Sequence, residues 1–233
     1  DNMPDFQPPK GMKDIMPDEM AKRKWMYANI RKVLDARGYL EIEPSALEDM
    51  KTLRATSGED IKNEIYCFKD KGGRDLGMRF DLTVGLARIA ATNPVAFPYK
   101  VYCISNMWRY DNPQFGRFRS FWQWDIEVFG AGAPVADAEI IAAGIKILEA
   151  LGLSDFEVRI NNRMLVEGML EYVGIKEDQM DAAMRTIDKV FKLTKKQLID
   201  EFKKNGLTPV QAEEILNAVS RRGEMKRVLA QIC

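Results

Sequence analysis

The sequence predicts an α+β protein in which an antiparallel sheet is flanked by helices and followed by an all-helical region. Segments that alternate apolar and polar residues, as strands do, are concentrated before residue 131 and lie between helical stretches. From Arg163 onward the pattern is almost purely helical, and the helices after about Lys176 are rich in charge. We therefore expect two domains, residues 1–168 with the sheet and residues 169–233 with helices alone.

The first region opens with a helix over residues 16–38, in which Met26, Ile30, Val33 and Leu34 form an apolar stripe and Gly38 follows as a stop. The remaining elements of this region follow from the same kind of pattern. They are a strand over residues 39–43 that Pro44 ends, two short strands within residues 63–80 joined at Gly72-Gly73, a helix over residues 83–93, strands over residues 100–110 and 121–130, a helix over residues 137–151 and a short strand over residues 156–161.

Two helix starts in the second region carry clear signals. Thr194 followed by Gln197 fits a capping box, in which each side chain bonds the other residue's backbone N–H. Thr208 stands before Pro209, and proline is favoured at the first helical position. We expect one helix to begin at each of these threonines.

The composition indicates a protein that buries a substantial core, since 46% of the 233 residues are hydrophobic. Lys+Arg and Asp+Glu are both 35, so no overall basic surplus points to nucleic acid, although a local patch remains possible. Cys67, Cys103 and Cys233 are scattered without metal-ligand spacing, which favours a reducing compartment. No apolar run is long enough to span a bilayer, and we expect a soluble cytoplasmic protein with no membrane partner.

The chain contains no histidine. This excludes histidine general bases, Ser-His and Cys-His nucleophile pairs, and most transition-metal sites within the chain. Any chemistry must therefore depend on arginine, lysine, carboxylates and amides, with or without a hard cation.

Residues 107–130 combine three arginines with aromatic and acidic side chains in a predicted hairpin. Because side chains alternate across a strand, Gln123, Asp125 and Glu127 share one face of its second strand. The other face, expected to be core, carries Trp122, Trp124, Ile126 and Val128. The polar row either faces water or forms the floor of a site.

Arg109 ends the preceding strand, and an antiparallel hairpin returns it to the neighbourhood of the polar row. A floor of Arg, Gln and Glu suits a small zwitterion and a phosphate, because guanidinium binds phosphoryl oxygens and carboxylates accept from N–H groups. In the connecting loop, Arg117 and Arg119 flank Gly116 and either cover a polyphosphate or form an ordinary solvated loop.

These residues resemble motif 2 of the class II aminoacyl-tRNA synthetases in the form found in the histidyl-tRNA synthetase family. The shared features are an arginine ending one strand, a loop with Pro-Gln and Gly-Arg, and a Phe-x-Gln strand with an acid four residues after the glutamine. Residues 8–20 resemble the family's N-terminal segment, and residues 38–48, with Pro44, resemble motif 1. Residues 73–91 resemble the Asp-Leu-Thr segment typical of archaeal and eukaryotic members. The resemblance runs in order to about Arg163, and the helical remainder is similar in place to the family's insertion domain.

The resemblance implies a class II catalytic core over residues 1–168 and an insertion domain over residues 169–233. It also implies that ATP and L-histidine react to give histidyl-adenylate, whose histidyl group then passes to tRNA(His). Arg109 matches the catalytic arginine that binds the α-phosphate of ATP. Asp111 and Arg117 match ATP-binding positions near the adenine and the γ-phosphate, although the family usually has glutamate where Asp111 stands. Mg²⁺ would be carried largely by the phosphates, with no dedicated metal site in the chain.

The resemblance assigns the amino-acid substrate to four positions. Glu127 matches the acceptor for the imidazole, Gln123 lies near the amino group, and Asp81 and Thr83 match the residues that hold the α-ammonium. Asp81 also suits a plain helix cap. Arg79 and Arg119 are as consistent with structural ion pairs as with ligand binding.

Two kinds of partner follow from the family. Motif 1 is typically a dimer interface, so we expect a homodimer. The helical insertion resembles the part that approaches tRNA, and its basic side chains either contact phosphates or form a solvated face. These side chains are Lys192, Lys195, Lys196, Lys203, Lys204, Arg221 and Arg222.

Motif 3, the histidine-specific arginine segment and the anticodon-binding domain have no counterpart before Cys233. We therefore expect a catalytic fragment truncated before motif 3, weak or inactive by itself. One alternative is a histidyl-synthetase-like regulatory subunit of ATP phosphoribosyltransferase, although such subunits tend to lose the ATP-contacting arginines. Another is a stand-alone nucleotide- or RNA-binding module of the same fold.

Overall fold

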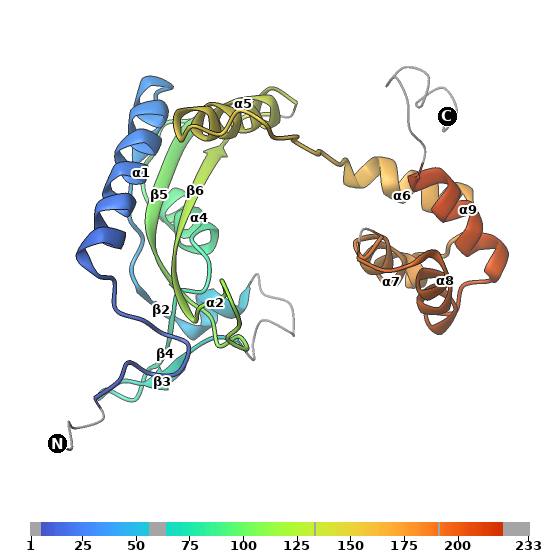
Figure 1. The fold of residues 1–233 in the computed structure, drawn as a ribbon, viewed down its shortest axis with the longest axis horizontal. Helices are drawn as coiled ribbons and strands as arrows, with labels where there is room; N and C mark the ends of the chain where they lie inside the picture. Colours follow the sequence, from blue (N-terminus) through green and yellow to red (C-terminus); the bar gives the residue numbers. More distant parts are fainter. Residues whose placement is uncertain (1–5, 56–63, 133, 191, 221–233) are drawn as a thin grey trace. The chain divides into compact units, whose positions relative to one another are not determined.

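The computed structural model describes residues 6–55, 64–132, 134–190 and 192–220. The chain divides into two compact units, Asp1–Glu157 and Val158–Cys233 (Figure 1). The division lies earlier than the boundary expected at residue 168, because helix α6 (Arg163–Tyr172) contributes Val166 and Leu170 to the core of the second unit. Among the helices of these described residues, none is long and apolar enough to cross a membrane.

The first unit contains a sheet of order β1-β5-β6, formed by β1 (Leu40–Glu41), β5 (Tyr99–Trp108) and β6 (Ser120–Phe129). The hairpin of β5 and β6 is antiparallel and pairs without interruption from Tyr99 opposite Phe129 to Trp108 opposite Ser120. The short β1 pairs with β5 in parallel, so the sheet is antiparallel only in its hairpin. This hairpin forms the centre of the unit.

A second sheet has the order β2-β4-β3, with β2 (Leu47–Asp49), β3 (Cys67–Lys69) and β4 (Asp75–Met78) all antiparallel. The two short strands expected within residues 63–80 are therefore confirmed as β3 and β4. Helix α2 (Met50–Ala55) follows β2 directly and packs Met50 and Leu53 against Ile65 and Phe80.

Helices cover both faces of the β5–β6 hairpin (Figure 1). On one face, α1 (Pro17–Ala36) and α5 (Val135–Ala150) bury a cluster that includes Ile30, Leu34, Tyr102 and Ile147. On the other face, α4 (Thr83–Thr92) packs Leu86 into a second cluster. Burial of apolar surface on both faces stabilises the hairpin at about 25 cal/mol per Å² removed from water.

The expected core face of β6 is confirmed for three of its four residues. Trp124, Ile126 and Val128 pack against the α1–α5 cluster. Trp122 is instead 39% exposed, and the guanidinium of Arg23 lies 5.3 Å from the centre of its ring. The expectation for Trp122 is wrong because this residue lies near the start of β6, where the guanidinium of Arg23 on α1 covers its ring and no apolar cluster of the described residues does.

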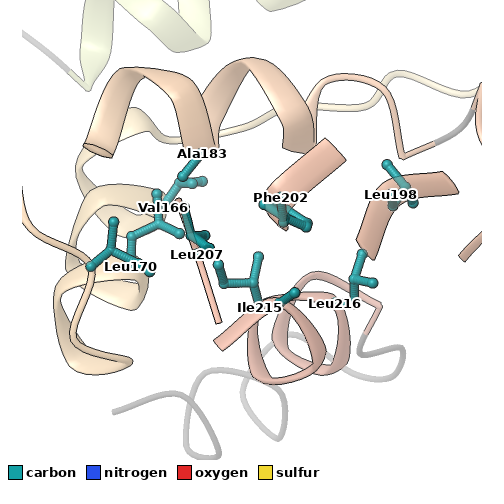
Figure 2. Packing of buried hydrophobic residues seen from close by; sticks show 10 residues of the cluster. Val166, Leu170, Ala183, Leu198, Phe202, Leu207, Ile215 and Leu216 are labelled. Atoms are coloured by element: carbon teal, nitrogen blue, oxygen red, sulfur yellow. The ribbon is translucent and has the colours of Figure 1, made fainter. Parts of the chain in front are cut away.

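The second unit is a bundle of four helices among its described residues: α6, α7 (Glu177–Ile187), α8 (Lys195–Lys204) and α9 (Pro209–Val219). Apolar side chains from all four converge, with Ala183 of α7, Phe202 of α8 and Leu216 of α9 among those buried (Figure 2). Thr194–Gln197 and Thr208–Gln211 form the capping boxes that begin α8 and α9, as predicted from their spacing.

Residues 156–161 do not form the strand expected there. Their alternation sets Val158 and Ile160 on one side, but these side chains are 44% and 73% exposed. An alternating segment becomes a strand when its apolar side is buried, and here that burial is missing.

Candidate active site

The polar row of β6 lies on the same face as the α4 cluster. Gln123 pairs with Ser105, Asp125 with Cys103 and Glu127 with Val101, and directly opposite residues of an antiparallel pair share a face. Cys103 and Val101 are buried in the α4 cluster. The polar row is therefore a partly buried floor beside α4. It is not a sheet face that is fully open to water.

Arg109 lies directly after β5 and is brought to this floor by the hairpin. Its Nε donates to the carbonyl oxygen of Phe80 at 2.8 Å, and its Nη2 donates to Gln123 Oε1 at 3.4 Å. The guanidinium also lies 5.2 Å from the centre of the Phe121 ring. These contacts orient Arg109 and leave its Nη1 without a hydrogen-bond partner in the described ranges.

Gln123 connects Arg109 to an acid. Its Nε2 donates to both carboxylate oxygens of Asp125 at 3.0 Å. The pKa of Asp125 is raised, first by burial and then by the charge of Asp81, while the bond from Gln123 and the charge of Arg109 oppose the rise. The order Arg109–Gln123–Asp125 thus forms one hydrogen-bonded chain across the floor.

Glu127 stands at the α4 end of the floor and accepts a hydrogen bond of 2.6 Å from Thr83 Oγ1. Burial raises its pKa, and the neighbouring charges of Asp125 and Asp81 raise it further, against the effect of the Thr83 bond. Three carboxyl groups therefore share a partly desolvated region with one arginine. A cationic ligand there would relieve their mutual repulsion.

Asp81 precedes α4, and its Oδ1 accepts from the backbone N–H of Val84 at 3.2 Å. This is the helix-capping role that its position allowed from the sequence. The electrostatic effect of Asp81 on Asp125 and Glu127 places the same carboxylate close to the floor. Asp81 can therefore cap α4 and also lie beside the floor.

The hairpin loop holds Asp111 and Arg117 together. Arg117 donates from Nε and Nη2 to Asp111 Oδ2 at 3.0 and 2.6 Å. The Asp111 side chain is 11% exposed and that of Arg117 is 53% exposed. Gly116 has φ +76°, a conformation that favours glycine and turns the loop tip.

Arg119 secures the base of the loop. Its Nε donates to the carbonyl oxygen of Asp111 at 2.9 Å, and its guanidinium lies 3.9 Å from the Tyr110 ring centre. Its backbone N–H donates to the carbonyl oxygen of Gly11 at 2.7 Å, which fastens the N-terminal segment to the loop. Gly11 has φ +83°, and a Cβ atom there would approach Arg119 Cδ to 2.9 Å. Of the two readings left open for Arg119, this geometry favours the structural one.

Arg79 is likewise structural. It is 3% exposed and donates to the carbonyl oxygens of Pro44 and Asn106 at 2.6 and 2.9 Å. It also bonds Glu43 at 3.0 Å and the hydroxyl of Ser105. Its donors bond backbone carbonyls, Glu43 and the Ser105 hydroxyl, and none of these hydrogen bonds reaches Gln123, Asp125 or Glu127.

Asp125 lies in the polar row that the sequence predicts, but the sequence indicates no role for it. The period-two alternation already set its side chain between Gln123 and Glu127, and that was the available signal. The hydrogen bond to Gln123 depends on side-chain rotamers, which a sequence pattern does not specify.

Comparison with known proteins identifies the family of the chain. A family model described as histidyl-tRNA synthetase matches residues 11–231. The histidine–tRNA ligase of Pyrococcus horikoshii is 39% identical over 222 residues, which cover 94% of this chain and 51% of that protein. The corresponding enzyme of Pyrobaculum neutrophilum is 39% identical over 213 residues, covering 91% of this chain and 51% of that protein.

Solved structures match as well. The crystal structure of histidyl-tRNA synthetase from Nostoc sp. PCC 7120 gives a TM-score of 0.83 at 30% identity and covers 98% of this chain and 52% of that one. An ATP phosphoribosyltransferase regulatory subunit/histidyl-tRNA synthetase from Bacillus halodurans gives 0.81 at 26% identity, covering 97% of this chain and 58% of that one. The chain spans about half the length of the curated relatives it matches. The chain therefore belongs to the histidyl-tRNA synthetase family of class II aminoacyl-tRNA synthetases.

Proposed function

We propose that this chain supplies part of the active site of a histidine–tRNA ligase. In that reaction a carboxylate oxygen of L-histidine attacks the α-phosphorus of ATP, pyrophosphate leaves, and the histidyl group of the adenylate then passes to tRNA(His). The observation that carries the proposal is the floor of β6, where one arginine, one amide and partly buried carboxyls converge beside α4. Positioning and charge stabilisation of this kind need no covalent intermediate.

Arg109 is the residue we assign to catalysis. Its Nε and Nη2 are fixed by Phe80 and Gln123, so Nη1 is held in place and remains available for an α-phosphate oxygen. A donor that is already oriented costs no reorganisation when negative charge develops on the phosphoryl group.

The carboxyl groups of the floor suit the two N–H-bearing ends of histidine. Glu127, anchored by Thr83, would accept from the imidazole, and Gln123 would lie near the amino group. Asp81, with one oxygen committed to Val84, and Thr83 would hold the α-ammonium.

Asp111 and Arg117 are the proposed contacts to the adenine end and the γ-phosphate of ATP. In the structure these two side chains bond each other. ATP binding would therefore replace the Asp111 carboxylate by a phosphate at the Arg117 guanidinium. Both anions accept the same paired N–H groups, so the exchange needs no change in the arginine's donor geometry.

Mg²⁺ would accompany ATP. No cluster of three or more acidic or cysteine side chains suited to a metal occurs among the residues that the structure describes. A Mg²⁺ ion carried mainly by the phosphate oxygens of ATP would supply charge neutralisation there.

Three further parts of the proposal concern partners and place. We propose a homodimer, tRNA(His) as nucleic-acid partner and a cytoplasmic location, all on the strength of the family. The helical unit would contribute lysines to tRNA binding, and of these Lys204 is paired with Glu201. Arg221 and Arg222, also expected there, lie outside the described residues.

Histidine-dependent ATP–pyrophosphate exchange tests the function in the full-length natural protein. Glu127→Ala should abolish activation of histidine while ATP binding is retained, and Arg109→Gln should lower the rate by about 100-fold or more. Arg74→Gln, at an exposed arginine paired with Asp70, is the matched control and should leave the exchange rate unchanged. Loss of ATP binding in Glu127→Ala would contradict the role given to Glu127.

We propose that residues 1–233 alone give little or no exchange, because the chain spans about half the length of the histidine–tRNA ligases it matches. A robust histidine-dependent exchange by this chain would contradict that expectation.

A second candidate is a histidine-sensing regulatory subunit, favoured by the likeness to the Bacillus halodurans protein. Such a subunit would bind histidine without activating it. The presence of Arg109 and Arg117 together with Gln123 and Glu127 favours the ligase. Histidine binding by the full-length protein with no exchange activity would favour the regulatory subunit instead.

A further inference from the structure

We propose that Asp125 is a positioning residue that fixes the side-chain amide of Gln123, so that the amide oxygen faces Arg109 and the ammonium group of the ligand. The inference deepens the proposed function and rests on it. It concerns a residue that neither the sequence pattern nor the family resemblance gave a role.

The amide of Gln123 is held between two groups of opposite hydrogen-bonding character. On one side, the carboxylate of Asp125 takes two contacts of 3.0 Å from Nε2. On the other, Arg109 Nη2 gives a hydrogen bond of 3.4 Å to Oε1. A carboxylate only accepts and a guanidinium only donates, so a single orientation of the amide satisfies both neighbours.

This orientation determines which kind of ligand group the floor accepts. The bond from Arg109 is long, and a carbonyl oxygen has a second lone pair, so Oε1 retains capacity to accept from an ammonium. If the Gln123 amide were reversed, its NH₂ group would face both the Arg109 guanidinium and the ammonium group of the ligand. Three hydrogen-bond donors would then lie together without an acceptor. Asp125 prevents that arrangement.

Asp125 has no comparable use in the fold. Among the described residues its hydrogen bonds come from Gln123 alone, and no lysine, arginine or backbone N–H within them pairs with it. It lies opposite buried Cys103 and near two other carboxyls, Asp81 and Glu127, where an ionised group is unfavourable. A partly buried carboxylate that serves only one amide is the arrangement expected of a residue that orients a neighbour.

The test is a double-mutant cycle in the full-length natural protein, measured by histidine-dependent ATP–pyrophosphate exchange. Asp125→Ala should raise the KM for histidine about tenfold, the loss of roughly one good hydrogen bond, and leave the KM for ATP unchanged. In the Gln123→Ala background the same substitution should change the KM for histidine by less than about twofold, because the group that Asp125 orients is gone.

A second variant and an analogue keep the test decisive if Asp125→Ala does not fold. Asp125→Asn preserves the shape, but its amide can donate as well as accept, so it no longer selects one orientation and should raise the KM for histidine. Imidazolepropionate, which lacks the ammonium group, should inhibit Asp125→Asn as strongly as the unmodified protein. Asp75→Asn, at an exposed acid of β4 paired with Lys69, is the control and should behave as the unmodified protein.

Three outcomes would overturn the inference. If Asp125→Ala raised the KM for histidine equally in the presence of Gln123 and in the Gln123→Ala background, Asp125 would not act through Gln123. If imidazolepropionate inhibited Asp125→Asn more weakly than the unmodified protein, in proportion to the rise in the KM for histidine, a contact between the Gln123 amide and the ammonium group would be excluded. Absence of histidine-dependent exchange in the unmodified full-length protein would remove the proposed function and this inference with it, whereas the first two outcomes leave the function intact.

Discussion

Replacing Arg79 by methionine should destabilise the strand unit, because it removes a buried donor whose hydrogen bonds go to framework atoms and to none of Gln123, Asp125 and Glu127. The guanidinium of Arg79 is buried and joins three separate segments: Glu43 and Pro44 after β1, Arg79 itself after β4, and Ser105 and Asn106 in β5. Methionine fills a similar volume but donates no hydrogen bond.

The size of the effect follows from the acceptors that lose their donor. Two backbone carbonyls, those of Pro44 and Asn106, are left unpaired in buried or partly buried positions. Each orphaned buried acceptor costs about 1–3 kcal/mol. Glu43 is 65% exposed at its side chain and regains water, so its loss adds little. The expected destabilisation is about 3 kcal/mol, within the range typical of broken buried networks.

Urea unfolding followed by tryptophan fluorescence measures this loss in the strand unit. All four tryptophans, Trp25, Trp108, Trp122 and Trp124, lie before residue 158. With an m value of about 2 kcal/mol per molar urea, the midpoint of Arg79→Met should fall by about 1.5 M. Arg74→Met, which removes an exposed ion pair, should move the midpoint by less than about 0.5 M. If the urea midpoint fell by the same small amount in both variants, the proposal that the hydrogen bonds of Arg79 stabilise the strand unit would be refuted.

Two other substitutions test the site and the helical unit. Folding raises the pKa of Glu127. The protonated form of Glu127 therefore contributes stability that is fully present below the unfolded pKa of about 4.3. That contribution is lost as the pH rises through the folded pKa. Glu127→Gln, which can still accept from Thr83, should therefore raise the urea midpoint at pH 8 and give no gain below pH 4, and a lower midpoint at pH 8 would contradict this. Phe202 is fully buried in the helical unit, and Phe202→Ala should cost about 3–5 kcal/mol there. Loss of helical circular dichroism at a lower temperature measures this effect, with exposed Val210→Ala as the control that should melt as the unmodified protein does.

The elements that the sequence predicted well are those in which local signals agree. The β5–β6 hairpin combines alternation with a Pro- and Gly-containing loop, and α8 and α9 begin at capping boxes whose bonds lie within four residues. The nearness of Arg109 to Gln123 also followed, because hairpin geometry brings the end of β5 back to the start of β6.

What the sequence could not specify depends on distant partners. The sequence predicted a strand at β1. It did not predict that β1 pairs in parallel with β5, because no local pattern determines which strand an edge strand joins. Residues 156–161 alternate like a strand yet lack a surface that buries Val158 and Ile160. The same limit applies to Trp122, which a cation covers, and to Arg79, whose role depends on carbonyls far along the chain.

If the loop binds the phosphates of ATP as proposed, the ion pair of Asp111 and Arg117 makes that binding an exchange reaction. An incoming anion does not meet a bare charge, because it must first displace a carboxylate of similar geometry. Chloride or a single phosphate would trade one ion pair for another and gain little free energy. A chain of linked phosphates that also reaches Arg109 would gain a contact that Asp111 cannot make, so the loop would select anions by their length as well as by their charge.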